Sequence, residues 1–289
     1  MKASINAAVL IALFAALSPS LSGQWPTYPT SGVPRLPNGE PNLDAPAPRT
    51  ADGKPDLSGL WRGTGFGPPV GSTNPPGTPP AARGAPRAAA APVTTPSGIP
   101  LATFRNVGAN FKDGLPLQPW AADLLTKRQA DNSKDNPEAH CLPMGIMQFH
   151  TQGAPRKFIQ TPAVLVILYE ASSGMRQIFT DGRPLPNNDP QPWWYGYSIG
   201  KWDGDTLVVE TSSLRDDGWL DIIGSPLTDA AKLTERFRRV SYGRMEIDIT
   251  VDDPKAYTRP WTVRVNQQIM VDTELIEFIC LENNRFSVK

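Results

Sequence analysis

The sequence predicts a mainly β protein whose strands form an antiparallel meander that closes into an up-and-down barrel. Nine segments after residue 155 have the composition of strands, short turns join most of them, and only one segment has helical periodicity. Short links place successive strands side by side. A meander of this length must close or fold over to protect its edges. A closed barrel is the first choice and an open sandwich the alternative.

The first 22 residues are typical of a secretory signal peptide. Lys2 gives a positive start, residues 7–17 are apolar, and small residues precede a cleavage point at Gly23 or Gln24. The apolar stretch is shorter than the roughly 20 residues of a membrane-spanning helix, so no membrane span is expected in the mature chain. We expect an exported protein, either periplasmic or extracellular.

Residues 23–100 are rich in Pro, Ala and Gly. Such a segment buries too little apolar area to offset its loss of conformational entropy, so most of it is expected to be disordered. Residues 54–61 differ, because Trp61 and two leucines lie together there. This island is predicted to dock on the later domain as a first strand or a plug. Residues 101–289 form the predicted domain of one helix and the barrel.

The helix is predicted over 119–134, where Trp120, Leu124 and Leu125 recur near helical spacing and basic residues lie toward the C-terminal end. The strongest hairpin turn is Asp203-Gly204. The predicted strands cover 156–161, 163–171, 174–180, 194–202, 206–213, 232–240, 244–251, 261–270 and 274–282. Polar and apolar residues alternate in 244–251, which predicts a strand with one solvent-exposed face. The apolar run within 163–171 predicts a strand that is covered on both faces.

Cys141 and Cys280 are the only cysteines. In an exported protein two thiols most often form a disulfide, and two buried free thiols are the alternative. The bridge would stabilise the fold by roughly 4 to 5 kcal/mol in the chain-entropy model. The sequence contains no CxxC and only two histidines, His140 and His150, so no metal site is predicted.

The charge balance argues against nucleic-acid binding. The chain has 28 basic and 28 acidic residues and no long Lys/Arg block. The GxSxG, GxxxxGK[ST] and HExxH motifs are also missing. The sequence therefore predicts no cofactor and names no reaction.

Aromatic residues form the first candidate site. Trp193 and Tyr197 belong to a cluster at 192–197, and Trp219 follows downstream. Aromatic rings give a large contact area at low entropic cost and suit a sugar or a planar apolar ligand. Packing in the core or at the end of the barrel is the alternative interpretation.

The second candidate is Glu235, which shares a strand face with Leu233 and Phe237. A carboxylate on the apolar side needs a partner or a raised pKa, and either makes it a candidate site. An interior ion pair with Arg176 or Arg264 is the alternative.

The third candidate is the acidic loop 215–226, which contains Asp221 and is the longest connection inside the sheet region. Its carboxylates suit general acid–base catalysis or the binding of a cation through oxygen. A solvated loop is the alternative.

Several motifs resemble a large family of exported bacterial proteins that is common in acidobacteria and related soil lineages. They are GKPDLSGLW (53–61), CLPMG (141–145), RQIFTDGRPLP (176–186), GKWDGDTLVVET (200–211), LTERFRR (233–239), DDPKAYTRPWTV (252–263) and EFICLEN (277–283). The resemblance names no activity. Members often carry His at the positions of Tyr197 and Leu227. If those histidines serve catalysis in the family, this chain has lost them.

Gly59-Leu60-Trp61 also resembles the Gly-x-Trp of lipocalin-like barrels, in which the Trp packs at the barrel base. This similarity implies a barrel with a cavity. The first functional hypothesis is therefore a lipocalin-like barrel that binds a small apolar or aromatic ligand. Trp193, Tyr197 and Trp219 would lie near its mouth, with Glu235 and Arg176 as polar anchors.

Two other functions stay open. An extracytoplasmic hydrolase, lyase or isomerase on the same barrel would use Glu235 and Asp221 as its acid–base pair, with Arg176 or Arg236 holding an anionic group. A cell-envelope interaction module would instead use the outer surface of the barrel to contact a partner.

Overall fold

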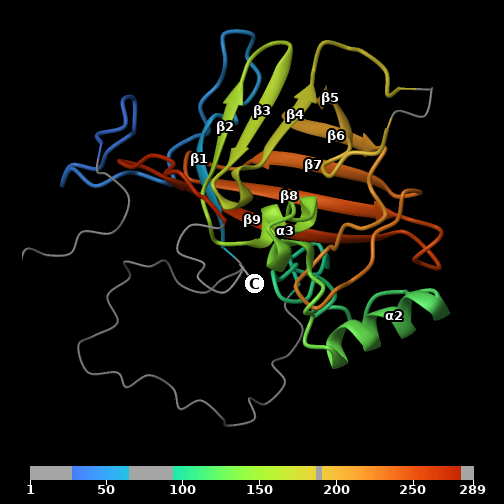
Figure 1. Ribbon diagram of the computed structural model, residues 1–289. Coiled ribbons are helices and arrows are strands. Elements are labelled where there is room, and N and C mark those ends of the chain that lie inside the picture. Colours follow the sequence, from blue (N-terminus) through green and yellow to red (C-terminus); the bar gives the residue numbers. More distant parts are fainter. Residues whose placement is uncertain (1–27, 65–93, 187–190, 281–289) are drawn as a thin grey trace, which may run out of the picture.

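The computed structural model describes residues 28–64, 94–186 and 191–280. Within them nine strands form a closed barrel in sequence order, with the last strand returning to the first (Figure 1). The predicted mainly β barrel is confirmed. The strands are β1 (Gly59–Gly63), β2 (Arg156–Gln160), β3 (Val164–Tyr169), β4 (Met175–Phe179), β5 (Tyr197–Asp203), β6 (Thr206–Ser212), β7 (Lys232–Arg239), β8 (Arg244–Asp252) and β9 (Trp261–Met270).

One seam of the barrel departs from the predicted antiparallel meander. β4 and β5 are parallel and share only two register pairs, Ile178 with Ser198 and Phe179 with Ile199. All other neighbouring strands are antiparallel. A tight hairpin cannot join parallel strands, and the chain between β4 and β5 is long enough to cross over. β4 and β5 therefore pair over a short stretch, and a long connection joins them.

The barrel closes through β1, which comes from the island predicted to dock at 54–61. Trp61 is the register partner of Arg156 on β2 and of Ile269 on β9. The ninth strand predicted at 274–282 is wrong for its described part, because residues 274–279 have no regular structure. β1 already occupies the free edge of β9, so no pairing site remains for a further strand.

The predicted disulfide is confirmed. Cys141 and Cys280 are bonded, with their Cα atoms 5.7 Å apart. Cys280 therefore ties the irregular segment after β9, rather than a strand, to the end of η1 in the long connection between β1 and β2.

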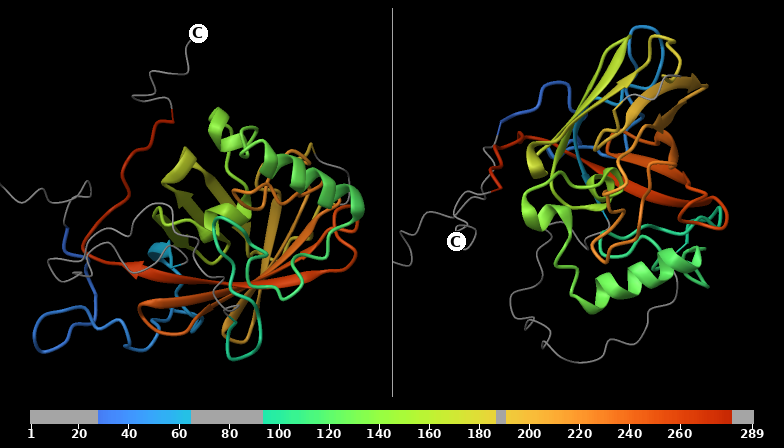
Figure 2. Two further views of the ribbon diagram at one scale, coloured as in Figure 1. Left: turned by 90° about the horizontal axis from the view of Figure 1, so that it is seen from below. Right: turned by 45° about the vertical axis from the view of Figure 1, so that its right-hand side comes forward.

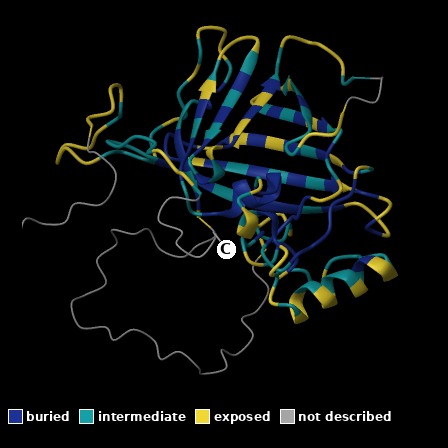
Figure 3. Ribbon diagram, in the orientation of Figure 1, coloured by how far each residue is buried: buried dark blue, intermediate teal, exposed yellow. Residues whose placement is uncertain are grey.

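The strands alternate buried and more exposed residues, as Figure 3 shows along the barrel wall. On β8 the predicted apolar face is fully buried, from Met245 to Val251. β3 differs from its prediction, since Leu165, Ile167 and Tyr169 are buried while the residues between them are only half-buried. One face of each strand thus builds the core, and the outer face of β3 is only partly covered.

Four helical segments accompany the barrel in the part of the chain that the structure describes. The predicted helix is present as α2 (Pro119–Ala130), which lies beside the barrel in both views of Figure 2 and ends four residues earlier than expected. The others are the 3-10 turns η1 (Pro137–His140) and η2 (Ala171–Ser173) and the short α-helix α3 (Ile146–Thr151). All six residues of α3 are buried. Only glycine fits immediately before it, because a Cβ on Gly145 would lie 1.9 Å from the carbonyl oxygen of Trp219.

Two similar turns in the Pro-rich segment contact the barrel. Nη2 of Arg35 donates to both carboxylate oxygens of Asp272, which follows β9. Nη1 and Nη2 of Arg49 each donate to one carboxylate oxygen of Asp205 in the β5–β6 hairpin. The turns share the pattern P-R-x-x-[DN]-G-[EK]-P-[DN]-L at 34–43 and 48–57. The predicted signal peptide and the Pro-rich residues 65–93 lie outside the described residues.

Candidate functional site

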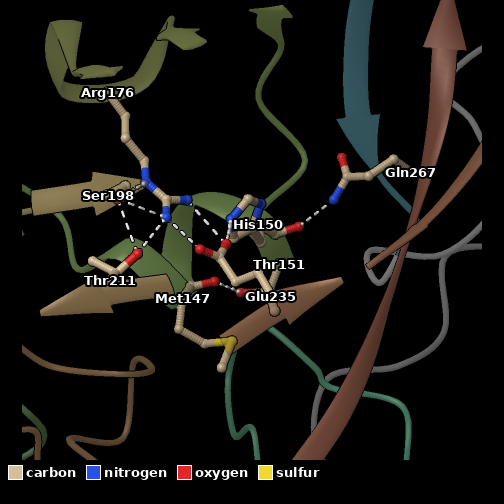
Figure 4. A network of polar contacts seen from close by, with 8 residues as sticks. All are labelled: Met147, His150, Thr151, Arg176, Ser198, Thr211, Glu235 and Gln267. Atoms are coloured by element: carbon tan, nitrogen blue, oxygen red, sulfur yellow. Dashed lines mark hydrogen bonds and ion pairs between the residues drawn. The ribbon is translucent and has the colours of Figure 1, made fainter. Parts of the chain in front are cut away.

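Glu235 lies inside the barrel, as its strand pattern predicts, and is fully buried. Its Oε1 accepts hydrogen bonds from Nη1 of Arg176 at 2.9 Å and from Nε2 of His150 at 2.8 Å. Nη2 of Arg176 bonds to Oε2, so the pair is bidentate (Figure 4). The interior ion pair that the sequence left as an alternative is therefore present, and it is formed with Arg176.

The guanidinium of Arg176 also binds two hydroxyl groups on the neighbouring strands. It donates to Oγ1 of Thr211 at 2.9 Å and to Oγ of Ser198 at 3.1 and 3.2 Å. The two hydroxyls lie 2.9 Å from each other. The network thus joins side chains from four consecutive strands, β4 to β7, and from α3.

The charges of this network are set by burial and by the ion pair. Burial raises the pKa of Glu235, but the attraction of Arg176 and the hydrogen bonds from His150 and Arg176 outweigh it and lower that pKa to about 2. Burial lowers the pKa of His150 more than Glu235 raises it. His150 is therefore neutral and donates its Nε2 proton to an ionised Glu235.

Sequence reasoning missed three residues of this network, His150, Ser198 and Thr211. The sequence offers His150 only as a possible metal ligand upstream of the strands. α3 carries it into the core, where its ring lies 5.8 Å from that of Phe237 and its backbone carbonyl accepts a hydrogen bond from Gln267. The available signal was the apolar run around it in 146–149, but six residues are too few for a helical period to stand out.

Asp221 is also fully buried, in a different environment. Its carboxylate accepts hydrogen bonds from the backbone N–H groups of Val107, Gly224 and Ser225 and from the Ser225 hydroxyl. Burial raises its pKa in spite of these bonds. Two side chains of α3 contact the two acidic residues. His150 donates to the carboxylate of Glu235, and Gln148 donates to the backbone carbonyl of Asp221. The contacts of Asp221 hold the 215–226 loop together.

The predicted aromatic residues separate into two places. Trp219 is buried in the loop, with the guanidinium of Arg128 4.3 Å from the centre of its ring. Trp193 and Tyr197 contact each other, with ring centres 5.6 Å apart. Tyr197 in turn stacks on Phe179 across the parallel seam at 5.3 Å.

The aromatic ladder of Trp193, Tyr197 and Phe179 ends at a cation. The guanidinium of Arg183 lies 3.8 Å from the centre of the Phe179 ring, and its Nη1 donates to the Tyr197 hydroxyl at 3.3 Å. The other end of the ladder is open, because Trp193 is 47% exposed.

An open groove of about 790 Å³ lies next to this ladder, on the outer face of β5 and β6 and at the edge of β7. Its lining includes Arg183, Ile199, Lys201, Trp202, Val208 and Arg236. Arg236 is held by Asp203 at 3.0 Å. We call this space the outer groove.

The five predicted ligand-binding residues therefore fall into three groups. Arg176 is inside with Glu235, and Trp219 packs against α2. On the outer surface Arg236 lines the outer groove, whereas Trp193 and Tyr197 belong to the aromatic ladder, whose Arg183 end borders it. Arg176 and Glu235 do not line the outer groove, and both are buried.

Trp61 of the Gly-x-Trp sequence is fully buried, with Arg239 4.9 Å from the centre of its ring.

Among the described residues no group of three or more His, Cys, Asp or Glu is placed to hold a metal ion. Nor does any helix there have the length and apolar character needed to cross a membrane. Comparisons with protein-family models, curated proteins and solved structures found no match.

Proposed function

We propose that this protein is an exported barrel that binds a small apolar or aromatic molecule in the outer groove. The observation that carries the proposal is a groove with an apolar floor that contains Trp202 and a small number of charged side chains. A concave surface lined by apolar and aromatic side chains with a few polar groups is typical of a ligand site.

The chemistry of the groove supports a planar ligand with a polar substituent. Ile199 and Val208 offer apolar contact, and Trp202 offers an aromatic ring in the same groove. Lys201 lies in the same groove and suits a carboxylate or a hydroxyl group on the ligand. The disulfide supports export, because such bonds persist in oxidising compartments.

The buried carboxylates favour binding over catalysis. A general acid needs a pKa near the working pH, whereas the pKa of Glu235 is lowered to about 2 and both its oxygens are engaged by Arg176. Asp221 is committed to the backbone of its own loop. A catalytic role for this pair and an envelope interaction module both stay predictions without a supporting contact.

Fluorescent probes test the proposal directly. N-phenyl-1-naphthylamine is neutral and 1-anilinonaphthalene-8-sulfonate is anionic, and both brighten in apolar sites. We expect saturable binding of at least one of them to the full mature chain. Trp202→Ala should weaken that binding about fivefold to tenfold, because it removes the aromatic contact inside the groove. Lys201→Ala should weaken the anionic probe more than the neutral one.

Trp120→Ala is the matched control, since Trp120 is 46% exposed but lies on α2 and does not line the outer groove. It should leave probe affinity unchanged. Binding that is not saturable, or equal losses in the two tryptophan variants, would contradict the proposal.

A further inference from the structure

A second arginine, Arg156, is fully buried inside the barrel. It lies at the start of β2, where its side chain points inward with that of Phe158. Its Nη2 donates to the backbone carbonyls of Gln152 at 2.7 Å and Ala154 at 3.2 Å. Its Nε and Nη1 have no hydrogen-bond partner among the residues that the structure describes.

Arg156 also lacks a counter-charge. Glu235 is bidentate to Arg176, so its charge is already matched. In the described residues no carboxylate forms an ion pair with Arg156. Burial lowers the pKa of Arg156 to about 10, which still leaves it protonated at neutral pH. A buried, unmatched cation is costly, and proteins almost always pair such a charge.

The neighbours of Arg156 supply a further donor. Tyr169 is its register partner on β3 and is also buried. Its hydroxyl interacts electrostatically with Arg156 and Arg176, and Arg176 lies close enough to donate toward its oxygen. The hydroxyl proton itself has no acceptor within the described residues. Burial raises the pKa of Tyr169 to about 12, so the hydroxyl keeps its proton. Two guanidinium nitrogens, which together carry three N–H groups, and one O–H group are therefore available on adjacent strands.

We infer that the barrel interior binds a small monoanion, of halide or formate size, on Arg156 and Tyr169. Such an ion would match the charge of Arg156 and accept from its Nε or Nη1 and from the Tyr169 hydroxyl. Nδ1 of His150 and Oε1 of Gln267 are also buried and unpartnered. They accept hydrogen bonds, so they suit a water molecule bound beside the anion.

The surroundings limit the size of the anion and the way it enters. Arg156 is fully buried and Tyr169 is 3% exposed, so the site is closed to solvent in the described part of the molecule. The anion would enter during folding or when the barrel opens, and would exchange slowly. This interior site is distinct from the outer groove and does not depend on ligand binding there.

Salt-dependent stability of the full mature chain tests the inference. The protein is unfolded and refolded with its disulfide intact in sodium bromide, sodium formate or sodium sulfate at one ionic strength. The unfolding midpoint should rise with the logarithm of bromide or formate concentration, because only the folded state binds the ion. Sulfate, a larger dianion, should not produce this rise. The two responding salts separate a halide site from a carboxylate site.

Two variants make the result specific. Arg156→Met removes the charge at similar length and should abolish the salt-specific rise. Tyr169→Phe removes only the hydroxyl, so it keeps the test valid if Arg156→Met does not fold. Tyr169→Phe should weaken the apparent affinity about twofold to tenfold, the effect of one hydrogen bond. Gln177→Ala on the outer face of β4 is the control and should respond as the wild type does.

Crystals grown in sodium bromide give the direct readout. An anomalous peak within hydrogen-bond distance of Nε or Nη1 of Arg156 supports the inference. Only water at this position in both bromide and formate crystals, or an equal salt response of wild type and Tyr169→Phe, overturns it.

Discussion

Glu235 and Arg236 are neighbours on β7, yet one belongs to the barrel interior and the other to the outer groove. The side chain of Glu235 is fully buried between Arg176 and His150. The side chain of Arg236 is 47% exposed and pairs with Asp203, which is 70% exposed. The two regions use the same kinds of charged residue, but only the outer one is in contact with solvent.

This difference in solvent contact decides what each ion pair contributes. An exposed pair is screened and typically contributes 0 to about 1 kcal/mol to stability. A buried pair has lost its hydration, so removal of one partner leaves an uncompensated charge and costs about 3 to 5 kcal/mol. We therefore expect the interior network to matter mainly for folding and the outer groove mainly for contact with other molecules.

The largest effect should follow from breaking the interior pair. Glu235→Gln keeps the size of the side chain but leaves Arg176 buried without its counter-charge. We expect the free energy of unfolding in urea to fall by about 3 to 5 kcal/mol, measured with the disulfide intact. A loss below about 1 kcal/mol would mean that water reaches Arg176, and the contrast between the two regions would fail.

Removing both charges should cost less than removing one. The Arg176→Met/Glu235→Leu double variant replaces the pair by apolar side chains of similar size. We expect it to be more stable than Glu235→Gln, because no buried charge is left unpaired. A double-mutant cycle on urea unfolding measures the coupling. If the double variant is less stable than both single variants, the hydroxyls of Ser198 and Thr211 depend on Arg176 more than the pair does.

Acid should weaken the interior before it affects the outer groove. The pKa of Glu235 is lower in the folded than in the unfolded chain, so its contribution is complete above the unfolded value, about 4.5. That contribution is lost as the pH falls from there toward about 2. The lowered pKa of His150 adds a loss that begins near pH 6.5, where the unfolded histidine takes up a proton. The midpoint of thermal unfolding between pH 7 and 3 measures this.

Glu235→Gln is the control for the pH series. It should flatten the curve below about pH 4.5, whereas Arg236→Ala should leave the shape of the curve unchanged. An unaltered acid response in Glu235→Gln would assign the loss to other carboxylates.

The smallest effect is expected at the outer groove. Arg236→Ala removes an exposed pair with Asp203 and should change the free energy of unfolding by no more than about 1 kcal/mol. Its effect should fall with added salt, because exposed charges are screened. Urea unfolding at low and high salt provides the test. A loss comparable with that of Glu235→Gln would show that the outer surface also carries a structural charge.

Much of the architecture follows from local patterns that can be predicted without knowing which segments meet. Period-two alternation predicted β8 and the inward position of Glu235, and Asp203-Gly204 predicted the β5–β6 hairpin. Two cysteines in a chain with a predicted export signal were enough to predict the disulfide. These properties depend on the backbone period and on pairwise chemistry, both of which are visible in short stretches of sequence.

The partners of each residue were decided only by tertiary structure. His150 reaches Glu235 across 85 positions of sequence, and Arg176 reaches it across 59. Trp61 closes the barrel beside β9, and the parallel seam brings Phe179 onto Tyr197. A strand's period says which face a side chain takes but not what lies opposite, because that depends on the register and order of strands far apart in the chain.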